Sequence, residues 1–98
     1  MHMSLEWDPQ KAESNLEKHG ISFEEAASAL LDPSALAMED ETAEREPRWV
    51  VIGMSNQARL LTVIYTVRMS DENADDIIRI ISARKSTKAE ASIYAQKL

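Results

Sequence analysis

Three runs rich in β-branched residues, all in the second half of the chain, constrain the fold more than any other feature. They cover residues 48–53, 60–68 and 77–84, and turn-like stretches at 55–57 and 70–76 separate them. Side chains branched at Cβ suit the pleated surface of a sheet, and short links join neighbouring antiparallel strands. The runs therefore predict three consecutive strands of an antiparallel sheet.

The first half carries the start and stop signals of two helices. Asp8 precedes a proline and Gly20 follows a periodic segment, which together predict a helix over Pro9–His19. In that helix Ala12 and Leu16 are expected to face the core.

A second helix is predicted directly after Gly20. Ser22 and Glu25 have the spacing of a capping box, and Asp32 followed by Pro33 ends the segment. The residues expected to face the core share a helical spacing: Phe23, Ala26, Ala27, Leu30 and Leu31.

Shorter signals complete the pattern. Residues 5–7 and 36–38 suit short strands, and Thr87 with Glu90 forms a capping box that opens a final helix, with Ile93 and Tyr94 packing back. A chain of 98 residues is long enough for one modest core. The predicted fold is a single α+β domain over residues 1–98, with two N-terminal helices, an antiparallel sheet of three to four strands and a C-terminal helix.

The composition limits the cellular compartment and the cofactors that can be expected for this chain. The chain has no cysteine, no apolar run near the ~20 residues that cross a bilayer, and no signal-peptide pattern. A cytoplasmic protein with no membrane partner is therefore expected. His19 and the scattered carboxylates lack the spacing of metal ligands, so we expect no metal and no other cofactor.

Charge is divided unevenly along the chain. Residues 1–47 hold 12 acidic and three basic side chains, whereas residues 48–98 hold five acidic and eight basic ones. This asymmetry suggests a basic surface on an acidic body. Mutual neutralisation of the two halves across the fold would account for the counts equally well.

Strand alternation predicts where the arginines point. In residues 60–68 the alternate positions 61, 63, 65 and 67 are plainly core, which leaves Thr66 and Arg68 on the opposite, uncovered face. Ser82 and Arg84 are expected to join them there, while Arg79 points the other way or lies at the edge. Guanidinium groups that converge on such a face would suit a phosphate. The alternative is a solvated face whose arginines pair with carboxylates.

Several short motifs together resemble the BrnT toxin family. Two segments carry most of the resemblance, namely KHGISFEEA at residues 18–26 and RIISARK at residues 79–85. The remaining matched positions, in chain order, are Trp7, Asp8, Lys11, Asn15, Glu46, Arg48, Gly53, the strand 61–66 with Arg68, Thr87, Glu90 and Tyr94.

The resemblance implies a RelE-like fold and a ribonuclease toxin of a type II toxin–antitoxin pair. Such toxins cleave RNA without a metal and halt translation. The implied partner is a BrnA-like antitoxin, a ribbon-helix-helix DNA binder that neutralises the toxin in a hetero-oligomer, so that contact with DNA is only indirect. The alternative is an inactive homologue that acts only as a protein-binding module.

Matched motif positions supply the candidate site. Metal-free RNA cleavage uses the 2′-hydroxyl as nucleophile and needs a base, an acid for the 5′-oxygen, and cations for the charge that builds on phosphorus. The candidate catalytic residues are Lys18, His19, Arg68, Ser82 and Arg84, with Arg68 and Arg84 as phosphate clamps and Ser82 orienting a phosphate oxygen. Further candidates are Arg48, Arg79 and Lys85 for RNA binding, and Glu46 as a base or as a residue that orients an arginine.

The low isoelectric point departs from this pattern. Proteins that bind RNA are usually basic, and this chain has a pI near 4.8. Two explanations compete: a weak or decayed nuclease, or an acidic flank that docks a basic antitoxin.

Overall fold

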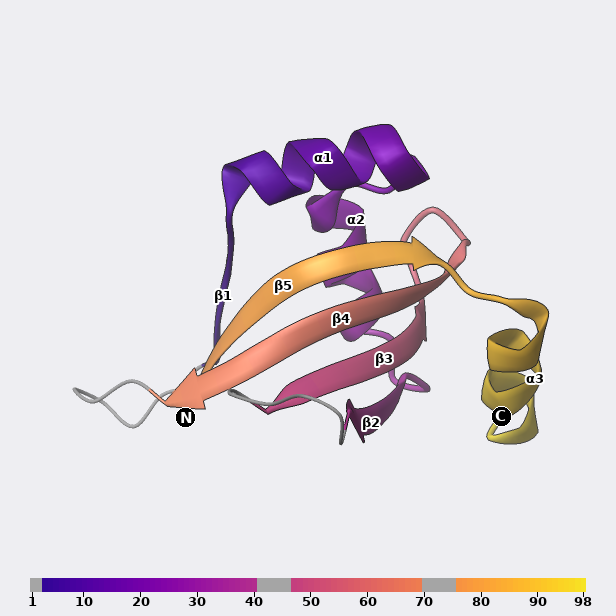
Figure 1. Ribbon diagram of the computed structural model, residues 1–98. Coiled ribbons are helices and arrows are strands. Elements are labelled where there is room, and N and C mark those ends of the chain that lie inside the picture. Colours follow the sequence, from indigo (N-terminus) through magenta and orange to yellow (C-terminus); the bar gives the residue numbers. More distant parts are fainter. Residues whose placement is uncertain (1–2, 41–46, 70–75) are drawn as a thin grey trace.

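The computed structural model describes residues 3–40, 47–69 and 76–98. It is an α+β fold, as predicted, with three helices and a five-stranded sheet (Figure 1). Along the chain the elements are β1 (Met3–Trp7), α1 (Pro9–His19), α2 (Phe23–Leu30), β2 (Leu36–Asp40), β3 (Arg48–Met54), β4 (Leu60–Met69), β5 (Asp76–Lys85) and α3 (Lys88–Gln96).

The sheet is mixed, with the strand order β1-β5-β4-β3-β2. Strands β2 to β5 pair antiparallel in chain order and form the predicted meander. Strand β1, whose residues 5–7 were expected to form a short strand, adds a fifth strand that runs parallel to β5, whereas three to four antiparallel strands were predicted. Parallel neighbours need a long crossover, and here the whole of α1 to β4 separates the two strands in the chain.

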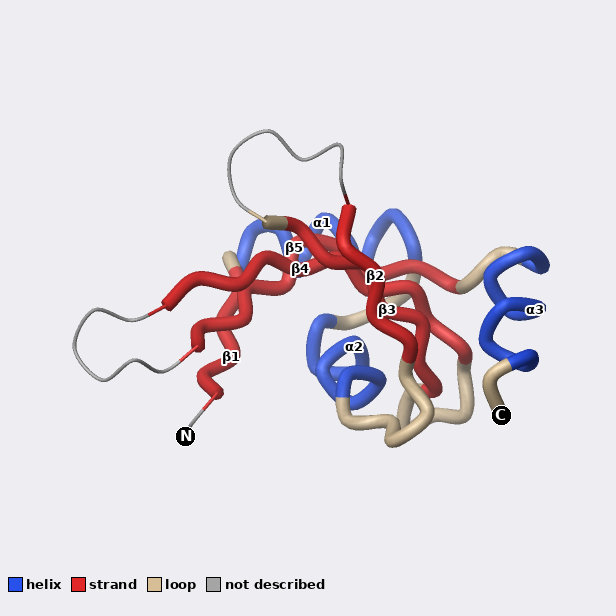
Figure 2. Tube along the Cα trace, turned by 90° about the horizontal axis from the view of Figure 1, so that it is seen from below, coloured by secondary structure: helices blue, strands red, loops and turns tan. Residues whose placement is uncertain are grey.

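The three helices contact different parts of the sheet. Helix α2 lies against one face, α1 runs along the β5 side, and α3 stands at the end away from β1 (Figures 1 and 2). The core lies beneath α1 and α2, and its fully buried residues are Ile21, Phe23, Ala26, Ala29, Leu61, Val63, Ile80 and Ala83. Trp7 closes one side with its ring edge-on to Phe23, 5.9 Å between centroids.

The predicted helix ends are present. The Asp8 carboxylate accepts a hydrogen bond from the Gln10 N–H at 2.9 Å, and Gly20 ends α1 in the left-handed region at φ 70°. The inward placement of Leu16 is wrong, because this side chain is 51% exposed. Ala12 packs against the core, as predicted, and Asn15, not Leu16, is the buried residue of α1.

Asn15 extends the sheet where β1 stops. The β1 ladder ends at Ile80, so β5 has no strand neighbour on that side at Ala83. There the Asn15 side chain donates to the Ala83 carbonyl at 2.8 Å and accepts from the Ala83 N–H at 3.1 Å. A third bond, from the Asn15 side chain to the Ile21 carbonyl at 2.9 Å, fixes the chain after α1. One amide side chain therefore replaces a strand residue and joins α1 to the sheet.

Helix α2 forms only half of the predicted capping box. Ser22 Oγ accepts from the Glu25 N–H at 3.1 Å, but the Glu25 carboxylate turns inward to Arg59 and Ser55. Leu31, predicted to be buried, is 81% exposed because α2 ends at Leu30.

Helix α3 begins with the complete capping box of Thr87 and Glu90. Tyr94 is buried, and its hydroxyl donates to Asp32 at 2.6 Å. Ile93 is 42% exposed, so Tyr94 is the residue that packs back. This contact holds α3 against the end of the sheet.

Candidate nucleic-acid interface

A bulge in β5 reverses the alternation on which the face prediction rested. Ile64 pairs with Ser82 and the next residue, Tyr65, pairs with Ile80, so Ile81 has no partner on β4. An extra residue of this kind turns all later side chains to the opposite face. Arg79 therefore shares a face with Ser82 and Arg84, and the prediction that it points the other way or lies at the edge is wrong.

Three arginines gather on this face at the β1 end of the sheet. Arg48 and Arg79 are both opposite Thr66 in the register, on the two strands that flank β4, and Arg68 lies two residues further along β4. Strand spacings near 4.8 Å place their Cα atoms within about 10 Å of one another. We call Arg48, Arg68 and Arg79 the arginine cluster.

The arginine cluster is open to solvent. The side chains of Arg68 and Arg79 are 58% and 47% exposed, and Arg48 is also exposed. Glu6, opposite Arg79 on β1, places Oε2 3.8 Å from both the Arg68 and the Arg79 guanidinium groups. Asp40 lies opposite Arg48 on β2. Long ion pairs between exposed groups are weak, so the guanidinium groups can bind an added anion at small cost.

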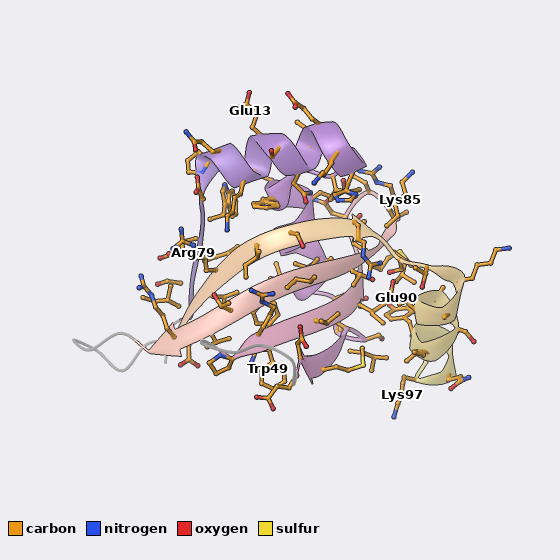
Figure 3. All side chains as sticks on the ribbon, viewed as in Figure 1. Glu13, Trp49, Arg79, Lys85, Glu90 and Lys97 are labelled. Atoms are coloured by element: carbon orange, nitrogen blue, oxygen red, sulfur yellow. The ribbon has the colours of Figure 1, made fainter. Side chains whose placement is uncertain are left out.

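Arg84 lies far from this cluster. It is opposite Thr62, whereas Arg68 is opposite Ile77, and six residues of β4 separate the two positions. At the rise of an extended strand this is about 20 Å. Arg79 and Lys85 accordingly lie toward opposite ends of β5 in Figure 3. The expected convergence of Arg68 and Arg84 on one phosphate is therefore wrong, although both lie on the predicted face.

Arg84 is already engaged by Glu90. Two guanidinium–carboxylate bonds of 2.7 and 2.8 Å join them, and the same carboxylate accepts from the Thr87 N–H at 2.8 Å and from the Thr62 hydroxyl at 3.0 Å. The bond from Arg84, followed by those from Thr87 and Thr62, lowers the pKa of Glu90 to about 2. This geometry indicates that Arg84 holds α3 on the sheet.

Acid should weaken this attachment. Because the pKa of Glu90 is lower in the folded chain than its ordinary value of 4.5, its contribution is fully present above pH 4.5 and is lost as the pH falls toward 2. We expect Glu90→Gln to reduce the free energy of unfolding at pH 7 on the order of 2 kcal/mol, allowing for the exposure of Arg84, and to have little effect at pH 2. Urea titrations at both pH values measure this. Glu13→Gln, on the outer side of α1 (Figure 3), is the control, and equal curves for the two variants would contradict the expectation.

A further ion pair, between Arg59 and Glu25 of α2, lies on the other face of the sheet. Arg59 Nε donates to Glu25 Oε2 at 2.9 Å and a second guanidinium nitrogen contacts Oε1, while Ser55 Oγ donates to the same carboxylate at 2.7 Å. The bond from Arg59 lowers the pKa of Glu25 despite burial, so this carboxylate stays ionised. The pair has no local signal in the sequence, because 34 residues separate its members.

The remaining candidates divide between the two ends of the sheet. Ser82 is half-buried and lies opposite Ile64, two residues along β4 from Thr66. It therefore adjoins the arginine cluster. Lys18 and His19 are exposed in the last turn of α1. His19 shares a helix face with Asn15, four residues earlier, so it lies near the Ala83 end of β5. Glu46 lies outside the described residues.

Glu6 was missed by the sequence reasoning. It is placed beside the arginine cluster only by the parallel pairing of β1 with β5, for which the sequence carries no local signal. Within residues 3–40, 47–69 and 76–98, no group of three or more histidine, cysteine, aspartate or glutamate side chains is arranged to hold a metal ion. In the same residues no helix has the length and apolar character needed to cross a membrane.

Comparisons with known proteins agree with this architecture. The sequence model of a family described as the ribonuclease toxin BrnT of type II toxin–antitoxin systems matches residues 7–90. The crystal structure of the Brucella abortus ribonuclease toxin BrnT is similar, with a TM-score of 0.63 and 24% identity over 89% of this chain and 100% of that one. No curated protein sequence matches significantly. The chain belongs to the BrnT family of ribonuclease toxins of type II toxin–antitoxin systems.

Proposed function

We propose that this chain is a metal-independent endoribonuclease that binds RNA on the open face of β3, β4 and β5. The observation that carries the proposal is the arginine cluster: three exposed arginines on adjacent strands, two of which, Arg68 and Arg79, make long ion pairs of 3.8 Å with Glu6. Planar guanidinium donors match the oxygens of a phosphate, and several such groups stabilise the charge that builds on phosphorus during cleavage.

The chemistry requires no group outside the RNA and the protein. The 2′-hydroxyl loses its proton to a base and attacks the adjacent phosphorus, the bond to the 5′-oxygen breaks, and that oxygen receives a proton. The products are a 2′,3′-cyclic phosphate and a 5′-hydroxyl. Glu6, 3.8 Å from Arg68 and Arg79, is our candidate for the base, and Ser82, on the same face, is our candidate for orienting a phosphate oxygen.

The other end of the sheet would bind a more distant part of the RNA. Lys18, His19 and Lys85 are exposed there. Lys85 is opposite Leu61, so it points to the face opposite the arginine cluster and lies about 20 Å from Arg68 along the strands. An RNA that reaches these cations would therefore pass around this end of the sheet. Arg84, bound by Glu90, would serve to hold α3 and not to clamp the scissile phosphate.

Membership in the family implies an antitoxin partner. We propose that this partner is a BrnA-like ribbon-helix-helix protein that neutralises the toxin in a cytoplasmic hetero-oligomer and alone contacts DNA. Release of the toxin would then inhibit translation through RNA cleavage.

Cleavage of RNA by the purified chain in EDTA tests the proposal. We expect Arg68→Ala and Arg79→Ala each to lower the cleavage rate at least about 10-fold, because each removes a charge-assisted contact to phosphate. Lys97→Ala, which removes an exposed cation at the far end of α3 (Figure 3), should leave the rate unchanged.

Two results would overturn the proposal. Equal rates for all three variants would show that the arginine cluster takes no part. Intact RNA at high concentrations of wild-type protein, together with tight binding of the antitoxin, would favour a binding module without turnover.

A further inference from the structure

An apolar trough lies on the face opposite the arginine cluster. Two adjoining hollows of about 240 and 440 Å³ share Ala37, Tyr65 and Ile78 as their floor. The other residues that line them are Leu30, Asp32, Ala35, Val51, Trp49, Val67 and Asp76. We call this surface the β2–β4 trough.

The trough exists because the helices cover only part of this face. Helix α2 ends at Leu30, and α1 lies on the β5 side of the sheet (Figure 2). Trp49 and Tyr65 face each other in the β3–β4 register, and both remain only half-buried. Exposed aromatic and aliphatic side chains that line a hollow commonly mark a protein interaction site.

Among the described residues, the charged side chains that line the trough are acidic, namely Asp32 and Asp76. Glu39 lies opposite Trp49 in the β2–β3 register, so it points to the same side and is exposed. Hydrogen bonds from the Tyr94 hydroxyl, then from the Met54 and Ser34 N–H groups, lower the pKa of Asp32 and keep it ionised. An apolar floor with an acidic rim complements an apolar segment flanked by cations.

We propose that the β2–β4 trough anchors the antitoxin by receiving an apolar segment of it that is flanked by lysine or arginine. The proposal rests on the antitoxin partner that family membership implies, and not on the ribonuclease chemistry. Successive strand residues point to opposite faces, so Trp49 lies in the trough while Arg48 lies in the arginine cluster. The trough is therefore a binding site separate from the cluster, and a different part of the antitoxin would have to cover the guanidinium groups to neutralise the toxin.

Trp49 provides a reporter within the trough. The probe is the purified product of the gene that adjoins this one, titrated into the wild-type chain. We expect the emission of Trp49 to move to shorter wavelength on binding, because the indole loses water. The shift should disappear in Trp49→Phe, which retains Trp7 in the core. An unchanged Trp49 emission at saturation would overturn the proposal.

Charge reversal at the rim tests the complementarity independently. The double variant Glu39→Lys/Asp76→Lys should bind the same probe at least ~10-fold more weakly, since cations would then oppose cations. Glu13→Lys, on the outer side of α1, is the matched control and should bind like the wild type. Equal affinity for the double variant and the control, or no binding by the wild-type chain, would overturn the proposal.

RNA cleavage separates this proposal from the proposed function. Free Glu39→Lys/Asp76→Lys protein should cleave RNA at the wild-type rate, because the trough and the arginine cluster lie on opposite faces. Weakened binding with unchanged cleavage supports the anchoring site, and unchanged binding contradicts it whether or not RNA is cut.

Discussion

Replacing Asn15 with alanine should lower the free energy of unfolding by about 3 kcal/mol. The side chain makes three hydrogen bonds to backbone groups in a buried site, two with Ala83 and one with Ile21. Alanine would leave an N–H and two carbonyl groups without these partners, and the desolvation of each is then uncompensated. The higher helix propensity of alanine offsets only about 0.6 kcal/mol of this loss.

Urea denaturation measures the effect, and Ser14→Ala is its control. Ser14 is exposed on the same helix, so its replacement should change the free energy of unfolding by less than about 0.5 kcal/mol. Hydrogen exchange should also become faster at the Ala83 amide in the Asn15 variant. A loss no larger than that of Ser14→Ala would show that Asn15 does not join α1 to the sheet.

Gly53→Ala should destabilise the chain by a comparable amount, about 3 kcal/mol. A Cβ at this buried position of β3 would overlap the carbonyl oxygen of Ala29 and lie 3.3 Å from the Cβ of Ala35. Ala29 belongs to α2 and Ala35 to the turn that follows it. The steric overlap can therefore be removed only if α2 moves away from β3.

Gly20, the other glycine of the chain, has room for a side chain but an unfavourable backbone angle. A Cβ at Gly20 has no heavy atom within 4 Å, but its φ of +70° is unfavourable for alanine, so Gly20→Ala should cost about 1 kcal/mol. Thermal or urea unfolding of the two variants measures the difference. Equal losses would contradict the claim that Gly53 is required for the close approach of α2.

Local chemistry made the element boundaries predictable. The limits of α1 follow from Asp8, a proline and Gly20, and the start of α3 follows from Thr87 and Glu90, all within a few residues of the ends they determine. Alternation predicted the core face of β4 correctly at Leu61 and Val63, which are fully buried, whereas Tyr65 and Val67 on the same face are only half-buried. These predictions succeeded because each depends on neighbours in the chain.

The candidate site was predicted as a set of residues and not as an arrangement. Arg68 and Arg84 lie on the expected face, but their separation follows from the β4–β5 register. The bulge at Ile81 has no marker in RIISARK, yet it brings Arg79 to the face of Arg68. At its own end of β5, Arg84 is bound by Glu90, a partner that was predicted only as a helix cap, because one carboxylate both caps α3 and binds a guanidinium group.

By itself, then, the sequence determined the helices, the antiparallel strands and the family, since caps, turns and alternation act over a few residues. Only the tertiary structure decided that β1 runs parallel to β5, that Asn15 completes the β5 edge and that Arg48, Arg68 and Arg79 assemble beside Glu6. The physical reason is that strand pairing and register depend on which long-range contacts bury the core best, and a short stretch of chain does not contain that information.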